Sequence, residues 1–200
     1  MTPVVDKLKI TPQDHGRRMS LDDFEGASVQ EGFHYELGRG IICVSEVPNP
    51  WHEFVLDAIR QQLSDYRKLN LCPQFLTATG GGCKILVKGL ESERHPDLAV
   101  YFTKPPMPGK AAWAVWVPEL VIELVSSGSE ERDYKEKREE YFQFGVKEYW
   151  IFDPSKSELL ALRRSKGVWE EHRFGQEGVY QSPLLPGLEL NLKPIFEAAL

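Results

Sequence analysis

Two carboxylates stand in segments that the sequence predicts to be β-strands. Asp97 follows a proline at the start of PDLAVYF, and Glu123 lies in the middle of the apolar segment PELVIELVS. Burying an unpaired charge costs several kcal/mol, so Glu123 requires a partner, a cleft or a metal. If the two strands are neighbours, one cation can bridge both acids. Mg²⁺ prefers such oxygen ligands and, beside a phosphate, supports phosphodiester hydrolysis.

Each of these acids also has an ordinary structural explanation. An aspartate is common in turns and at the start of strands, and Asp97 follows a proline at the start of a predicted strand. Glu123 could instead form a buried ion pair, for which the sequence offers Lys84, Arg132 and Lys137 as partners. Residue type alone leaves these alternatives open.

The segment after Glu123 has the pattern of an amphipathic helix. Three aromatic residues and one lysine recur at spacings of three, four and three residues: Tyr134, Lys137, Tyr141 and Phe144. The remaining charged residues mostly fall on the solvent face: Lys135, Glu136, Arg138, Glu139 and Glu140. A lysine on the inward stripe pairs with a buried carboxylate or extends to solvent. Asp133 also offers Lys137 a simple i,i+4 pair.

A third carboxylate, Glu36, lies in the segment YELGRG. Alternation along a strand places it on the opposite face from Tyr35 and Leu37. Glu36 could therefore join Asp97 and Glu123 in one site, or face solvent on a half-buried hairpin. Spacing alone does not decide between these two interpretations.

These residues require a framework of strands and helices, which the hydrophobic pattern supplies. Strands are predicted at 34–46 (a hairpin around Gly38–Arg39–Gly40), 74–79, 83–88, 96–102, 118–126, 147–153, 158–164 and 168–174. Helices are predicted at 20–27, from Pro50 to about residue 70, at 127–144, and in a short segment at 194–200. The strand–helix–strand unit from 118 to 153 should be a parallel crossover. The sequence thus predicts an α/β or α+β fold, with a central mixed sheet flanked by helices and additional β-hairpins.

The length, composition and net charge of the chain indicate which broad class of protein it belongs to. The chain has 200 residues, 42% hydrophobic and 27% charged, which is typical of one folded domain, with residues 1–18 as a loosely ordered N-terminal extension. Its net charge of −6 argues against a protein that coats DNA non-specifically. Three cysteines without a CxxC pair, and no signal peptide, indicate a cytoplasmic protein. No apolar run is long enough to span a membrane.

Several motifs together resemble one known family. The segments PDLAVYF, PELVIELVS and RDYKEKREEYFQFGVKEYWIFDP, with YELGRG, PNPWH and SPLLPGLELNL, are similar to the Uma-type restriction endonuclease family of the PD-(D/E)XK nuclease superfamily. The likeness covers most of the chain, and the combination is more specific than any single motif. It implies a restriction-endonuclease-like core, Mg²⁺ or Mn²⁺ as cofactor, DNA as substrate and a homodimer.

The resemblance also implies roles for individual residues. Asp97 and Glu123 match the metal-binding acids. The superfamily lysine usually follows the second acid by two residues, where this chain has Val125, whereas the Uma-type pattern has its lysine in the next helix, at Lys137. Glu36 matches the acid of the early YEL-like motif. His52 in NPWH matches a recurrent accessory position, although it could also be a histidine at a helix start without a chemical role.

Three functions fit the sequence to different degrees. The first is a metal-dependent DNA endonuclease, a phosphodiester hydrolase. The second is a nuclease-fold module that binds nucleic acid or oligomerises with little or no hydrolysis, which the absence of a strongly basic helix favours. The third, a glycosidase with two carboxylates, requires a sugar platform that the sequence does not mark. Divalent-metal binding that an Asp97→Asn substitution abolishes would separate the first from the others.

Overall fold

The structure is a computed structural model that describes residues 8–69, 76–79 and 82–199. A six-stranded sheet with the order β12–β11–β10–β9–β8–β5 forms its centre. The strands are β5 (Leu76–Thr79), β8 (Leu98–Tyr101), β9 (Leu120–Leu124), β10 (Glu148–Asp153), β11 (Glu158–Ser165) and β12 (Val168–Gly175). β9 and β10 run parallel, and the other neighbouring pairs are antiparallel. The predicted mixed central sheet is therefore confirmed.

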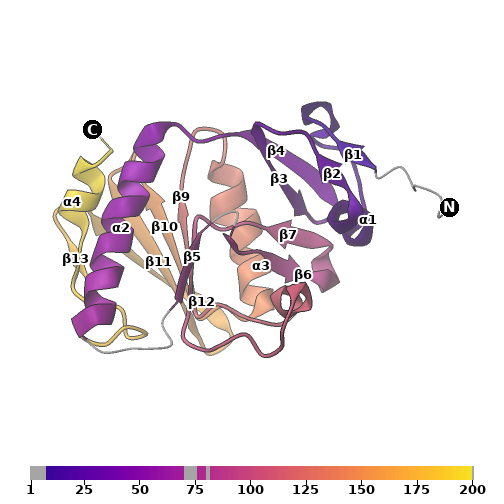
Figure 1. Cartoon of the computed structure of the whole chain (residues 1–200). Helices are drawn as coiled ribbons and strands as arrows, with labels where there is room; N and C mark the ends of the chain where they lie inside the picture. The colour runs from indigo at the N-terminus through magenta and orange to yellow at the C-terminus, as the bar shows by residue number, and fades with distance from the viewer. Residues whose placement is uncertain (1–7, 70–75, 80–81, 200) are drawn as a thin grey trace.

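The parallel pair is connected by the helical segment that follows β9 (Figure 1). This segment contains a π-helical turn at Arg132–Glu136 and continues as α3 (Lys137–Phe144). Gly145 ends the helix with a φ of 106°, a left-handed conformation that glycine adopts readily. The predicted strand–helix–strand crossover is confirmed, but the π turn is a departure from regular helix geometry, and such turns often occur at functional sites.

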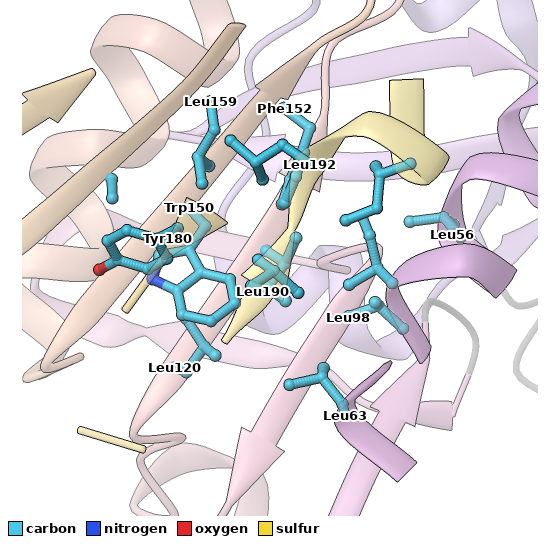
Figure 2. Packing of buried hydrophobic residues seen from close by; sticks show 14 of the residues in the cluster. Leu56, Leu63, Leu98, Leu120, Trp150, Phe152, Leu159, Tyr180, Leu190 and Leu192 are labelled. Atoms are coloured by element: carbon cyan, nitrogen blue, oxygen red, sulfur yellow. The ribbon is translucent and has the colours of Figure 1, made fainter. Parts of the chain in front are cut away.

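One face of the six-stranded sheet is covered by α2 (Pro50–Leu69) and α4 (Leu192–Glu197). Figure 2 shows Leu56 and Leu63 of α2 close to Leu98 of β8, within the same cluster as Trp150 and Phe152 of β10. Apolar burial of this kind contributes about 25 cal/mol per Å² and stabilises the sheet–helix contact. Among the residues that the structure describes, no helix is both long and apolar enough to cross a membrane.

The opposite face of the sheet packs on α3. Along β9, Leu120 and Ile122 join the cluster under α2, whereas Val121 joins the cluster that contains Tyr141 of α3. Because strand side chains alternate, Glu123 shares the face of Val121 and points toward α3. This alternation explains how an acidic residue occupies the middle of a strand that is buried on both faces.

A second sheet of four strands, β4–β3–β7–β6, lies on the far side of α3 (Figure 1). Its strands are β3 (Phe33–Gly38), β4 (Ile41–Glu46), β6 (Ile85–Val87) and β7 (Ser92–Arg94). β3 and β4 form the predicted hairpin, with Arg39 and Gly40 at φ values of 50° and 72° in the turn. The predicted strands at 74–79 and 83–88 correspond to β5 and β6, which belong to different sheets; residues 74–75 lie outside the described residues.

The N-terminal segment packs on the smaller sheet. β1 (Lys9–Ile10) pairs with β2 (Ser28–Val29), and Ile10 is buried. Between them lies α1 (Leu21–Gly26), whose first turn is capped by the Ser20 hydroxyl, which accepts from the amide of Asp23. Residues 8–18 of the predicted extension include β1 and a 3-10 turn at Pro12–Asp14, and residues 1–7 lie outside the described residues.

A buried carboxylate anchors the C-terminal segment to the central sheet. Glu148, the first residue of β10, is 3% exposed. Trp150 Nε1, the Tyr180 hydroxyl and the Ser182 hydroxyl donate to it at 2.8, 3.0 and 2.9 Å. Tyr180 belongs to β13 (Val179–Tyr180), which pairs with β14 (Leu190–Asn191). These hydrogen bonds satisfy a charge that would otherwise be costly to bury.

We expect Glu148→Gln to lower the free energy of unfolding by about 1–3 kcal/mol, because the amide turns an NH₂ group toward buried donors. Urea unfolding of this variant and of Glu170→Gln, an exposed position on β12, would measure the difference. Equal midpoints for Glu148→Gln and the wild type would contradict the role of the network.

Candidate active site

A cleft of about 710 Å³ opens between the six-stranded sheet and the four-stranded sheet. Strands β3 and β4 line one side, and the first half of α2, β9 and the start of the following helix line the other. The five residues singled out in the sequence all line this cleft: Glu36, His52, Asp97, Glu123 and Lys137. The fold therefore brings the predicted residues together, whatever role each of them has.

Asp97 and Glu123 face each other on adjacent strands. The antiparallel register pairs Leu98 with Ile122, which sets Asp97 opposite Glu123. The amide of Leu124 donates to Asp97 Oδ2 at 2.8 Å, and the amide of Asp97 lies 3.4 Å from Glu123 Oε2. The side chain of Asp97 is 23% exposed and that of Glu123 is 3% exposed. One carboxylate therefore opens to the cleft, and the other lies beneath its surface.

Lys137 reaches Glu123 from α3. Its Nζ lies 2.9 Å from Glu123 Oε1, 3.1 Å from Asp133 Oδ1 and 3.8 Å from Glu36 Oε1, and its side chain is 4% exposed. The Tyr141 hydroxyl donates to the same Glu123 oxygen at 2.5 Å. The sequence offered two partners for Lys137, a buried strand carboxylate and Asp133 one helical turn away. In the structure Lys137 pairs with both Glu123 and Asp133.

Glu36 approaches the same point from the second sheet. It is 8% exposed and faces the cleft, which rules out the solvent-facing alternative. The amide of His95 donates to Glu36 Oε1 at 2.9 Å, and Arg94 Nη1 lies 3.3 Å from Glu36 Oε2. Through Glu36, the four-stranded sheet contributes directly to the acidic cluster of the cleft.

Arg94 links the two sides of the cleft. Its side chain is fully buried on β7 and contacts Glu140 of α3 through Nε at 2.6 Å and Nη2 at 3.0 Å. A Cβ atom at Gly38 would lie 2.3 Å from Arg94 Nη2, so the glycine of the YELG motif leaves room for the guanidinium. The sequence pattern placed Glu140 among mostly solvent-facing residues, and for Glu140 this is wrong because Arg94 covers it.

His52, near the start of α2, contacts the exposed acid. Its Nε2 lies 3.5 Å from Asp97 Oδ2. Burial lowers the pKa of His52, but the hydrogen bond and negative charge of Asp97 outweigh burial and raise it. His52 can therefore hold the Asp97 carboxylate in place, whereas the sequence alone left open a histidine without any role.

The two buried acids of the cluster respond differently to their surroundings. Burial raises the pKa of Glu123 to about 8, with Lys137 opposing the shift and Asp97 adding to it. Burial would also raise the pKa of Glu36, but Lys137, Arg94 and Arg132 outweigh it and lower that pKa to about 2. The crowded carboxylates thus make Glu123 the acid that resists ionisation without a further cation.

We expect Glu123→Gln to raise the melting temperature of the metal-free protein at pH 8. A pKa raised from 4.5 to about 8 means that Glu123 supports the folded state below pH 4.5 and loses this contribution as the pH rises to about 8. Glutamine does not ionise, so the variant should gain about 2–4 °C over the wild type at pH 8, the effect of 1 kcal/mol in a domain of this size. Thermal unfolding in EDTA at pH 5 and pH 8 measures this; a lower melting temperature at pH 8 would instead mean a net stabilising Glu123–Lys137 ion pair.

The donor groups fit a hydrated divalent cation. Eight carboxylates but only four Lys and Arg side chains line the cleft. Among the described residues, no group of three or more His, Cys, Asp or Glu side chains converges to enclose a metal. Mg²⁺ does not require such a cage, because it commonly binds one or two carboxylates together with waters and substrate phosphates. Asp97 and Glu123 lie side by side at an acidic cleft and could supply the two carboxylates of such a Mg²⁺ site.

The sequence did not single out two basic side chains at the site. Arg94 lies in the segment SERHPD, in which Asp97 is the only residue that the sequence indicated as functional. Arg132 was considered only as an ion-pair partner of Glu123, yet it lines the cleft and lies closer to Glu36. Its position directly before Asp133, and five residues before Lys137, is the one signal that could have identified it.

This mixed α+β fold, with a central mixed sheet flanked by helices, is also found in a solved structure. That structure is titled as "a putative nuclease belonging to DUF820", from Anabaena variabilis, and matches this chain with a TM-score of 0.73 and 16% sequence identity. The match covers 91% of this chain and 99% of that chain.

The family follows from the sequence match. Residues 21–193 match the model of the Uma2 family, which is described as "Putative restriction endonuclease". The chain belongs to the Uma2 family, as its motifs predicted. No match is found among curated proteins.

Proposed function

We propose that this protein is a divalent-metal-dependent endonuclease that hydrolyses phosphodiester bonds in DNA. The observation that carries the proposal is that Asp97, directly before β8, lies opposite Glu123 of β9 at the wall of a cleft, with Lys137 2.9 Å from Glu123. Membership of a restriction endonuclease-like family supports the same reaction class.

Each side chain of the cluster has a distinct task in this proposal. Asp97 and Glu123 would hold Mg²⁺ or Mn²⁺, which when bound makes a coordinated water more acidic and neutralises charge on the phosphate. Lys137 opposes the rise in the pKa of Glu123 and holds its carboxylate in one orientation. Glu36 and Asp133 in turn hold Lys137, and His52 orients Asp97.

The charge of the cleft disfavours a module that binds nucleic acid without metal. A cleft with eight carboxylates and four Lys and Arg side chains repels phosphates unless a cation enters first. This electrostatic balance supports a requirement for divalent metal in both binding and hydrolysis.

The test is a cleavage assay on plasmid and linear DNA with Mg²⁺ or Mn²⁺ titrated against EDTA. We expect nicking or cutting that depends on the metal and disappears in EDTA. Isothermal calorimetry on the same protein should detect one divalent-cation site. Metal binding without any DNA cleavage across substrates would contradict the enzymatic part of the proposal, and absence of metal binding would contradict all of it.

A further inference from the structure

We propose that Arg132 is the residue that binds a phosphate of the nucleic-acid substrate at this cleft. The inference rests on the proposed nuclease function and adds the side chain that meets the substrate's negative charge. It starts from the four cationic side chains that line the cleft: Arg60, Lys84, Arg132 and Lys137.

Three of these four cations are already engaged by carboxylates. Arg60 Nη2 lies 3.1 Å from Glu53, and Lys84 Nζ lies 2.7 Å from Glu25 and 3.1 Å from Glu93. Lys137 is enclosed by three acids, of which two lie within 3.1 Å. A phosphate would have to displace close carboxylate partners to reach Lys84 or Lys137. Arg60 Nε is also buried without a hydrogen-bond partner, but Nη2 of Arg60 is held by Glu53.

Arg132 is different. Its two ion contacts are both long and both made by Nε, 3.8 Å from Glu36 Oε2 and 4.0 Å from Asp133 Oδ1. Nε is buried without a hydrogen-bond partner, and within the described part of the chain the guanidinium donates no hydrogen bond. The side chain is 21% exposed and lines the cleft. The four N–H donors of Nη1 and Nη2 are therefore available to an incoming anion.

The planar guanidinium of Arg132 is suited to bind a phosphate. A guanidinium matches the paired oxygens of a phosphate, and charge-assisted hydrogen bonds of this kind are about twice as strong as neutral ones. Glu36 and Asp133 are close enough to Arg132 to hold it over the cleft by charge, but too far to saturate it. This geometry also separates two tasks, because Lys137 is 4% exposed and holds the acids, whereas Arg132 remains open to the substrate.

The decisive variant is Arg132→Gln, tested for two affinities that should respond differently. DNA binding is measured by fluorescence anisotropy on a labelled duplex, with Ca²⁺ supplying the divalent charge through oxygen ligands and a gel confirming that the duplex stays intact. We expect the Kd for DNA to rise about 10- to 100-fold. The slope of log Kd against log salt should fall by about 1, the signature of one lost phosphate contact.

The affinity for Mg²⁺ alone, measured by calorimetry, should not fall. Removal of a positive charge near Glu36 and Asp133 makes the cleft more negative, so Mg²⁺ should bind equally or more tightly. A purely structural role for Arg132 would weaken both affinities together, and that result would overturn the proposal. Arg132→Lys, which keeps the charge but loses the fork, should give an intermediate loss of DNA affinity and serves if Arg132→Gln does not fold.

The matched control is Arg67→Gln, an exposed arginine near the end of α2. An equal loss of DNA affinity in the control would indicate a general charge effect and would overturn the assignment, as would a Kd for Arg132→Gln within twofold of the wild type. A wild type that binds DNA but never cleaves it would refute the endonuclease function while leaving the Arg132 comparison valid. A wild type that binds no DNA in the presence of metal would overturn both.

Discussion

An Asp97→Asn variant is expected to lose divalent-metal binding and nearly all DNA cleavage. Asparagine retains an oxygen that can accept from the amide of Leu124, now at 2.8 Å, so the strand pairing should survive. It removes the charge of the more exposed of the two acids, the one that opens to the cleft. We expect cleavage to fall about 100- to 1,000-fold, the range for losing one essential electrostatic group.

Calorimetry with Mg²⁺ and a cleavage time course would measure this effect. Asp65→Asn, an exposed position on the same protein that pairs with Lys68, is the matched control and should retain both activities. Circular dichroism should show the same melting temperature for Asp97→Asn as for the wild type, or a higher one, since one repulsion is removed. Full metal affinity in Asp97→Asn would exclude Asp97 as a ligand.

Much of this site could be predicted because its signals are local. Glu123 stands out as the single charge in an apolar strand, and alternation along β9 decides which face it takes. Asp97 opens the adjacent strand, so pairing of the two strands brings both acids together. Lys137 and Tyr141 are four residues apart, and both indeed contact Glu123.

The predicted helical stripe persists through the π turn. Tyr134 and Phe144 pack against the cluster that contains Tyr141, and Lys137 is buried beside them. The π turn buries Asp133 as well, which is 2% exposed and contacts Lys137, while the Tyr134 hydroxyl donates to Asp153 at the edge of the cluster. Periodicity therefore identified the inward residues, and the burial of Asp133 is the feature that it left open.

Other contacts depend on how the two sheets are placed, which no local pattern encodes. Glu140 looks like a solvent-facing helix residue until β7 brings Arg94 over it. Arg132 is one of many charged residues in its segment, and its open guanidinium follows from the position of Glu36 on the other sheet. Residues that join distant elements are therefore recognised only in the folded chain.

Lys137→Met is expected to destabilise the protein strongly at neutral pH. The lysine is 4% exposed and lies within 4 Å of Glu36, Glu123 and Asp133. Methionine preserves most of the packing of the stem but leaves the buried carboxylates without their shared cation. Breaking a buried ion pair on one side typically costs about 3–5 kcal/mol. Lys135→Met, on the same helix segment with an exposed i,i+4 partner, should cost no more than about 0.5 kcal/mol.

The destabilisation should depend on pH with a predictable sign. Lys137 is the largest of the positive charges that lower the pKa of Glu36 to about 2. A lowered folded-state pKa contributes stability that is present above the unfolded value of 4.5 and is lost as the pH falls to about 2. Lys137→Met should therefore fall furthest behind the wild type above pH 4.5 and approach it as the pH falls toward 2, as urea unfolding across this range would show.

The double variant Lys137→Met/Asp133→Asn separates stability from catalysis. Removing one uncompensated acid should restore part of the lost stability, and a non-additive gain in the double-mutant cycle would measure the Lys137–Asp133 coupling. If Lys137 also makes Glu123 easier to ionise when the metal binds, the rescued protein should still cleave DNA at least ~10-fold more slowly than the wild type. Cleavage at the parent rate in the rescued protein would confine Lys137 to a structural role, with Asp97 and Glu123 left as the residues that carry the reaction.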